Sequence, residues 1–208
     1  MKQVYIHGLG QSCNSWNETL NLLETSDEIL LIDLVDMIFG KDATYKNMYD
    51  AFSKKCNETE GQLDLCGLSL GGVLALNYAI DNPQKVHSLV LIATQYKMPL
   101  TLLRIQNIFF RFMPNSNFIS TGFQKADFIR LCKTMMRLDF SSDIPKITCP
   151  TLVLYGEKDK ANEKASISLS KLLQNGTLKK IKNSGHEANI DAPEALGLIL
   201  NEFYKLTH

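Results

Sequence analysis

Gly67-Leu68-Ser69-Leu70-Gly71 is the stretch of sequence that decides the fold of this chain. A short apolar run over residues 63–66 leads into it, and a helix-like run over residues 72–80 leads out of it. This order predicts a strand, a sharp turn and a helix, with Ser69 at the apex. Glycines suit both shoulders, because the apex backbone is strained and a Cβ at either flank would crowd the neighbouring elements. The serine hydroxyl would then stand at a sheet edge, beside the positive end of a helix.

The size and charge of the chain are those of one globular domain. Its 208 residues are 45% hydrophobic, which is enough for a full sheet covered by helices. Acidic and basic residues balance at 22 each, so we expect no nucleic-acid partner. The opening residues 1–6 are too short for a signal peptide. The longest apolar run, residues 89–93, is far below the length of a membrane span, so no transmembrane segment is expected.

Cysteine usage favours a reducing compartment. The chain has five cysteines, which are odd in number, widely spaced and without a Cys-x-x-Cys pair: Cys13, Cys56, Cys66, Cys132 and Cys149. Reduced thiols in a cytoplasmic protein are the simplest interpretation. The same spacing gives no reason to expect a structural zinc site.

Apolar runs of strand length alternate with helix-like stretches along most of the chain. Strands are predicted at residues 3–6, 28–32, 62–66, 87–92, 151–155 and 176–181. Most of these runs are apolar throughout, which indicates a parallel sheet with helices on both faces. Helices are predicted at residues 16–24, 45–56, 70–81, 163–174 and 193–205. We therefore expect a single domain over residues 1–208.

One stretch, residues 98–143, is about twice as long as an ordinary connection between strands. It holds two amphipathic pieces and is interpreted as a helical insertion over one end of the sheet. In this stretch and at its start, bases outnumber acids. The bases are Lys97, Arg104, Arg111, Lys125, Arg130, Lys133 and Arg137, and the acids are Asp127, Asp139 and Asp143. A solvated outer face explains this charge most simply. A basic mouth that favours anionic substrates and an amphipathic surface anchor are the alternatives.

A Ser/Asp/His arrangement can be assembled from three predicted loops. A serine hydroxyl is a poor nucleophile unless a base takes its proton and a third group orients that base. His186 follows the last predicted strand, at the sheet edge where open α/β sheets place their reactive groups. Asp159 follows the strand at 151–155 and is the acid candidate, with Glu157 as a competitor in the same loop. Either acid could instead cap a helix or form a turn.

The other three histidines are weaker candidates for a base. His208 is the last residue, and His87 begins a predicted strand. His7 is interpreted as an orienting residue or as a buried imidazole with its hydrogen bonds satisfied.

An oxyanion would need backbone donors near the serine. One is the N–H of Leu70, at the first turn of the predicted helix. The other candidate is the N–H of Leu9, in His7-Gly8-Leu9-Gly10, where glycines allow close approach of the backbone. The alternative is that these glycines only shape a strand-to-helix turn.

Four motifs together resemble the α/β-hydrolase fold superfamily, in its serine-hydrolase branch. They are His7-Gly8-Leu9-Gly10, Gly67-Leu68-Ser69-Leu70-Gly71-Gly72, Gly156-Glu157-Lys158-Asp159, and Gly185-His186 followed by Ala192-Pro193-Glu194. They span nearly the whole chain in the family's order of nucleophile, acid and histidine. Their joint occurrence at matching element boundaries is far more specific than any one of them.

The resemblance implies a role for each candidate residue. Ser69 is the implied nucleophile, Asp159 the acid and His186 the base, and the N–H groups of Leu9 and Leu70 are the implied oxyanion donors. It also implies a three-layer α/β fold in which residues 98–143 form the helical cap that the family inserts after its sixth strand. No metal ion and no organic cofactor is expected for this chemistry.

Two features depart from the family pattern. The family usually opens with an antiparallel hairpin, but here the strand before the His-Gly turn begins the chain, so we expect a compact, mostly parallel sheet of six strands. The family's Asp-x-x-Gly-x-Gly loop is replaced by Asp33-Leu34-Val35-Asp36 and a lone Gly40. No substrate contact is therefore carried over from that loop.

The resulting hypothesis is a hydrolase that cleaves an ester-like bond, a carboxylester or thioester, of a small or medium acyl substrate through an acyl-enzyme. Esterases, thioesterases, lipases, lactonases, peptidases and carbon–carbon bond hydrolases share these motifs, so the motifs do not select a substrate. Two alternatives are a ligand-sensing binding protein with little turnover and an acyltransferase.

Overall fold

The core of the molecule is a six-stranded parallel sheet with the strand order β2-β1-β3-β4-β5-β6. The computed structural model describes residues 1–100, 103, 108, 112–115, 118 and 122–208. The strands are β1 Lys2–Ile6, β2 Glu28–Ile32, β3 Leu63–Leu68, β4 Val86–Ile92, β5 Thr151–Gly156 and β6 Gly176–Ile181. The predicted α/β fold class, with a compact parallel sheet of six strands, is confirmed.

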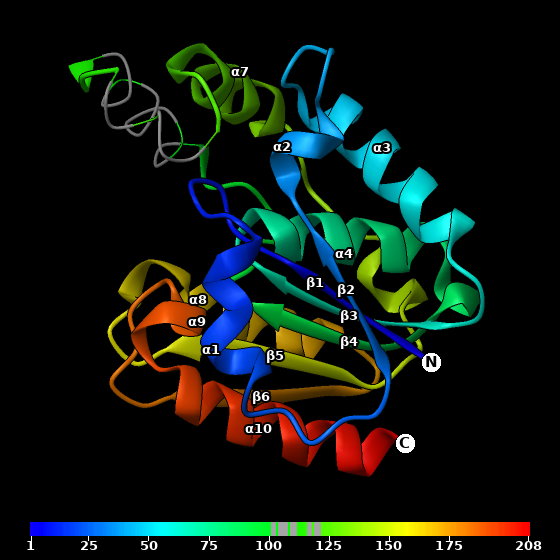
Figure 1. The fold of residues 1–208 in the computed structure, drawn as a ribbon. Coiled ribbons are helices and arrows are strands. Elements are labelled where there is room, and N and C mark those ends of the chain that lie inside the picture. Colours follow the sequence, from blue (N-terminus) through cyan, green and yellow to red (C-terminus); the bar gives the residue numbers. More distant parts are fainter. Residues whose placement is uncertain (101–102, 104–107, 109–111, 116–117, 119–121) are drawn as a thin grey trace.

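Helices cover both faces of the sheet (Figure 1). The α-helices among the described residues are α1 Asn17–Leu20, α2 Leu34–Met37, α3 Tyr45–Glu58, α4 Leu70–Asp81, α7 Lys125–Met135, α8 Lys160–Leu172, α9 Ala188–Asp191 and α10 Pro193–Thr207. One core cluster joins α3, α4 and α8 to one face of the sheet. A second cluster joins α10 to the other face, where Tyr5 and Trp16 meet edge to face.

Burial follows the position of each strand in the sheet. Every residue of β3 and of β5 is buried, whereas the edge strands β2 and β6 are partly exposed. A strand with helices on both faces has no solvent-facing side, which is why β3 and β5 are mostly apolar, with Asp64 the buried charged residue of β3.

Several predicted boundaries were wrong by a few residues. The helix predicted at 16–24 is a 3₁₀ turn, Cys13–Trp16, followed by the single turn of α1. Helix α8 begins at Lys160 rather than at 163, because the Asp159 carboxylate accepts the backbone N–H of Asn162 and caps the helix. The short helices α2 and α9 were not predicted.

Residues 98–143 follow β4, and their ends lie together. Lys97 and Asp139 form an isolated antiparallel bridge, reinforced by an ion pair of 2.8 Å. Helix α7 lies in this segment, near α2 and α3 (Figure 1). Much of the first amphipathic piece, including Arg104, Phe109 and Arg111, lies outside the described residues. No helix among the described residues is both long and apolar enough to cross a membrane.

Candidate active site

Ser69 occupies the strained turn between β3 and α4. Its backbone has φ 54° and ψ −114°, in a region that non-glycine residues rarely adopt. Its N–H donates to the carbonyl of Ile92 at 2.8 Å, which fixes the turn against the end of β4. A Cβ on Gly67 would lie 2.5 Å from the backbone of Gly71, and one on Gly71 would lie 2.3 Å from the carbonyl oxygen of Ile6. Both shoulders therefore require glycine.

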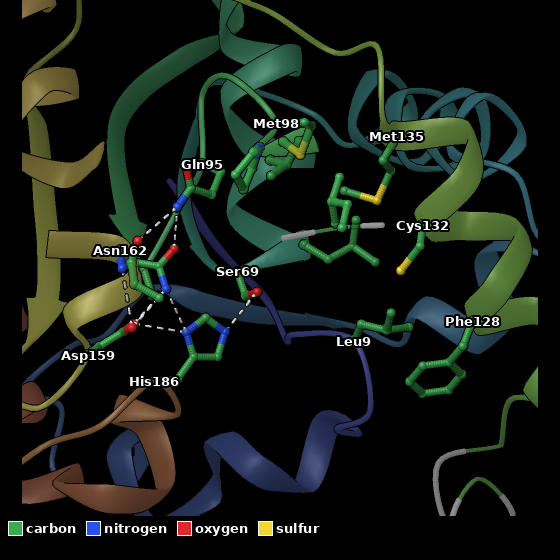
Figure 2. A pocket seen from close by; sticks show the side chains of 16 residues that line it. Leu9, Ser69, Gln95, Met98, Phe128, Cys132, Met135, Asp159, Asn162 and His186 are labelled. Carbon is green, nitrogen blue, oxygen red and sulfur yellow. Dashed lines mark hydrogen bonds and ion pairs between the residues drawn. The ribbon is translucent and has the colours of Figure 1, made fainter. Parts of the chain in front are cut away.

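Three loops bring Ser69, His186 and Asp159 into one chain of hydrogen bonds (Figure 2). The Ser69 hydroxyl lies 3.0 Å from Nε2 of His186. Nδ1 of the same ring lies 2.9 Å from Oδ2 of Asp159. With Nδ1–H donating to the carboxylate, Nε2 is free to accept the serine proton. The loops follow β3, β5 and β6, whose carboxyl ends share one edge of the parallel sheet.

Asp159, and not Glu157, is the carboxylate that contacts His186. Glu157 pairs with Lys180 at 3.3 Å and accepts the backbone N–H of Asn183, so it points to solvent. Asp159 is almost completely buried. Burial alone would raise its pKa, but hydrogen bonds from His186 and Asn162 bring the pKa below its ordinary value. The carboxylate is therefore charged at neutral pH.

Asn162 and Gln95 extend this network, and no sequence motif pointed to either residue. The Asn162 side-chain amide donates to both carboxylate oxygens of Asp159, at 2.8 and 2.9 Å. Its own carbonyl oxygen accepts from Gln95 Nε2 at 2.8 Å (Figure 2). Asn162 stands at the third position of α8, one helical turn from Asp159, and this spacing is the only sequence signal that could have suggested the contact.

The loops that carry Asp159 and His186 are packed against each other. A Cβ on Gly156 would lie only 2.0 Å from the carbonyl oxygen of Gly185, so this contact requires glycine. The N–H of Lys158 donates to the carbonyl of Ser184, and the N–H of Gly185 donates to Asp191 at 2.8 Å. The packing of these two backbone segments thus fixes the distance between Asp159 and His186.

His7 orients the loop that holds Leu9. The imidazole is fully buried: Nδ1 donates to the carbonyl of Gly8 at 2.8 Å, and Nε2 accepts the N–H of Leu34 at 3.1 Å. This confirms the interpretation of His7 as a satisfied, buried imidazole. In a trans peptide the C=O and N–H point in opposite directions. Holding the Gly8 carbonyl toward His7 therefore turns the Leu9 N–H away from His7.

Leu9 and Leu70 both line the cavity that contains Ser69 and His186. Leu70 is the first residue of α4, so its N–H has no acceptor within the helix. Leu9 and Leu70 thus lie beside Ser69 in the cavity wall, and their role as oxyanion donors stays a prediction.

The cavity at this site has a volume of about 720 Å³ and mostly apolar walls. The walls include Val73, Met98, Leu103, Phe128, Cys132 and Met135. The described lining residues include no lysine and no arginine. Among the apolar residues of the 98–143 segment, Leu103 lines the cavity, Phe112 is 84% exposed and Phe109 lies outside the described part of the chain.

Three bases in or beside the 98–143 segment have partners that do not line the cavity. Lys97 pairs with Asp139, Arg130 with Asp42, and Lys125 donates to the carbonyl of Met113. The described bases thus favour the solvated-face interpretation over a basic mouth.

Known proteins with the same architecture match this chain over most of its length. A family model described as alpha/beta hydrolase fold matches residues 4–147. The pimeloyl-[acyl-carrier protein] methyl ester esterase of Wigglesworthia glossinidia brevipalpis is 24% identical, over 97% of this chain and 93% of that protein.

Two solved structures illustrate the range of chemistry found on this fold. A malate-bound thermophilic esterase from Thermogutta terrifontis has a TM-score of 0.83 and 19% identity, over 100% of this chain and 90% of that one. The enol-lactonase from Burkholderia xenovorans LB400 has a TM-score of 0.82 and 16% identity, over 98% and 91%. At identities this low, the structural similarity establishes a common fold alone, so the reaction has to be inferred from the residues of the site.

Proposed function

Because this chain belongs to the α/β-hydrolase fold family, we propose that it is a serine hydrolase that cleaves an ester-like bond of a small or medium acyl substrate. The observation that supports this most strongly is the chain of hydrogen bonds from Ser69 through His186 to Asp159, at the wall of an apolar cavity. Ser69, His186 and Asp159 are the proposed catalytic residues.

The first half of the proposed reaction acylates the serine. Ser69 Oγ attacks the substrate carbonyl while Nε2 of His186 takes its proton. The charged Asp159 holds the ring with Nδ1–H toward the carboxylate and stabilises the imidazolium that forms. The backbone N–H groups of Leu9 and Leu70 donate to the oxyanion. His186 then protonates the leaving alcohol or thiol as the carbon–oxygen or carbon–sulfur bond breaks.

The second half of the proposed reaction releases the acid. Water enters where the leaving group departed, and His186 takes a proton from it as the oxygen attacks the acyl-serine. Collapse of this second intermediate frees the carboxylic acid and returns the proton to Ser69. Every step uses side chains and backbone of this chain, so no cofactor is required.

The walls of the cavity support a neutral, largely apolar acyl group. A buried carboxylate on the substrate would find no lysine or arginine among the described lining residues, and an unpaired buried charge is costly. The methyl ester cleaved by the Wigglesworthia relative, as its name states, is a neutral ester of this kind. We further propose that residues 1–208 form one domain with residues 98–143 as its cap.

A panel of p-nitrophenyl esters of increasing acyl length, offered to wild type and Ser69→Ala, tests the proposal. Wild type should turn over the shorter and medium esters, and Ser69→Ala should lose that turnover. Ligand-induced stabilisation without turnover in wild type would contradict hydrolysis and favour the binding protein. Transfer of the acyl group to an added alcohol or amine in preference to water would favour the acyltransferase.

A further inference from the structure

A second group of ligating side chains lies at the edge of the sheet opposite Ser69. Asp64 is the second residue of β3 and His87 the second of β4, so both lie at the amino ends of their strands. His208 follows α10 and reaches the same place; both chain ends lie at this edge in Figure 1. Ligand atoms of Asp64, His87 and His208 all lie within 4.8 Å of one another.

A β-bulge brings His87 to this group. Leu63 pairs with Val86, but Asp64 pairs with Ser88, so His87 is an extra residue on β4. Neighbouring side chains of a regular strand point to opposite faces of the sheet. Here Nδ1 of His87 and Oγ of Ser88 both contact Oδ1 of Asp64, at 2.9 and 2.6 Å. The bulge thus turns two successive side chains toward one carboxylate, as bulges do at specialised sites.

Asp64 is a fully buried carboxylate whose basic partners are both imidazoles. Among the ion pairs of the described residues, it contacts only His87 and His208, with Nε2 of His208 at 3.1 Å from Oδ2. A buried carboxylate is costly unless it is paired or coordinates a metal ion. Besides the hydroxyl of Ser88, a positive charge at this site would therefore stabilise the carboxylate.

His208 lies between two carboxylates. Its Nδ1 is 3.4 Å from Asp27, and its Nε2 is 3.1 Å from Asp64. A neutral imidazole has one N–H, so it can donate to one carboxylate only and must turn a lone pair toward the other. A metal ion on Nε2 removes this conflict, because Nδ1–H then donates to Asp27. Histidines that bind a metal ion commonly donate their other ring N–H to a carboxylate in this way. A second proton on the His208 ring would also remove this conflict, and the experiment below distinguishes that proton from a bound metal ion.

We propose that Asp64, His87 and His208 bind a divalent transition-metal ion of the zinc type. Zn²⁺ takes histidine nitrogens and carboxylate oxygens at about 2 Å, with water in a remaining position. Small side-chain rotations bring atoms that are already within 4.8 Å of one another around such an ion. The ion would join β3, β4 and the end of α10, a structural role remote from Ser69.

Cysteine spacing gave no sign of this site. Asp64 is separated from His87 by 23 residues and from His208 by 144, and no cysteine takes part. The ligands meet only through the pairing of β3 with β4 and the docking of α10, so no short motif reveals them.

Another cluster, His7, Cys13 and Asp33, is the competitor that a test must exclude. Both ring nitrogens of His7 already bond to the backbone, at Gly8 and Leu34. Burial and the nearby Asp33 raise the pKa of Cys13 to about 11, which disfavours the thiolate that metals bind. This cluster is therefore the poorer ligand set.

The test is calorimetric titration of Zn²⁺ into the full chain, freed of any tag and of bound metal. One equivalent should bind at micromolar Zn²⁺ and raise the Tm, since a ligand of the folded state stabilises it. His87→Ala and His208→Ala should each lower the affinity by at least about 100-fold, because even changes behind a ligand cost 10–100-fold. His186→Ala and Cys13→Ser each remove a ligating side chain elsewhere and should keep wild-type affinity.

Co²⁺ supplies a second readout. Its bound form should absorb in the visible range without the thiolate charge-transfer band that a Cys13 ligand would produce. The proposal is overturned if no equivalent of metal binds and the Tm responds only to pH, which is the behaviour of a protonated His208. It is also overturned if affinity survives in both histidine variants and falls in Cys13→Ser. Ester turnover by His208→Ala should match wild type, so this outcome is independent of the proposed hydrolysis.

Discussion

At Asp159, burial and hydrogen bonding act on the carboxyl group in opposite directions. Burial alone would raise its pKa, and the hydrogen bonds from His186 and Asn162 outweigh that effect. A carboxylate that stays charged can hold His186 in the tautomer that a serine nucleophile needs. In the proposed mechanism, the reactivity of Ser69 thus depends on Asn162, the third residue of α8.

Single substitutions in the proposed triad should each remove most of the activity. We expect Ser69→Ala, His186→Ala and Asp159→Asn each to lower kcat by about 10³-fold or more, because the three groups act as one unit. The double variant Ser69→Ala/His186→Ala should be no slower than Ser69→Ala alone. Steady-state kinetics with one p-nitrophenyl ester measure both effects.

Glu157→Gln is the matched control for the acid, since both carboxylates stand in the same loop. It should retain activity within about twofold, because Glu157 contacts Lys180 rather than His186 and solvent-exposed ion pairs contribute little. Full activity in Asp159→Asn together with loss of activity in Glu157→Gln would contradict this assignment and make Glu157 the acid that orients His186.

Asn162 should act as a positioning residue for Asp159. We expect Asn162→Ala to lower kcat by about tenfold with little change in KM, because it loosens the carboxylate without touching the acyl pocket's apolar walls. Asn47→Ala is the control, since Asn47 holds the same third position in α3 and likewise donates its backbone N–H to the capping side chain. Equal kinetics for the two variants would exclude the positioning role.

The lowered pKa of Asp159 also predicts a pH dependence of stability. A carboxylate with a folded-state pKa below its unfolded value stabilises the fold fully above the unfolded value, about 3.9, and loses that contribution as the pH falls through the folded value. Asn162→Ala removes hydrogen bonds that lower this pKa and brings the folded value closer to the unfolded one, so the variant should lose less stability than wild type as the pH falls. Urea titrations from pH 3 to 7 compare the two curves. Parallel curves would contradict this assignment.

At the scale of elements, the junction of β3 and α4 is determined by close backbone approach. A Cβ on Gly71 would meet the carbonyl oxygens of Ile6 and His7, which cannot rotate away. We expect Gly71→Ala to lower the free energy of unfolding by about 2 kcal/mol or more. A Cβ on Gly40 would meet no atom within 4 Å. Gly40→Ala should therefore lower the free energy of unfolding by only about 1 kcal/mol, because of the positive φ of 72° at this position. Urea denaturation measures both, and equal costs would contradict the packing argument.

Element types could be predicted from sequence far better than element ends. The mostly apolar sequences of β3 and β5 reflect burial on both faces of the sheet, which the residue pattern indicates directly. Helix α8 begins earlier than predicted because its cap is Asp159, a residue also considered for chemistry. The single turns α2 and α9 are too short to show periodicity, so tertiary contacts decide them.

The candidate site could be predicted as far as its residues occupy loops at one sheet edge. Ser69, Asp159 and His186 follow strands whose order and direction bring them together. Asn162 and Gln95 could not be found this way, because their contact joins the loop after β4 to the first turn of α8 and depends on side-chain rotamers.

At the scale of the whole molecule, the apolar cavity beside Ser69 should select neutral acyl groups. We expect kcat/KM for p-nitrophenyl hexanoate to exceed that of an ester of equal length ending in a carboxylate by at least about tenfold, since an unpaired buried charge is costly. The methyl ester of that carboxylate is the size-matched neutral control and should regain most of the rate. Faster turnover of the anionic ester would instead support a basic mouth formed by residues 98–143.

The reactivity of one hydroxyl group is the central claim, and fluorophosphonate labelling followed by peptide mapping measures it. A single adduct should form on Ser69, be absent in Ser69→Ala and form far more slowly in His186→Ala. An adduct on another residue, or equal labelling rates in wild type and His186→Ala, would contradict the account.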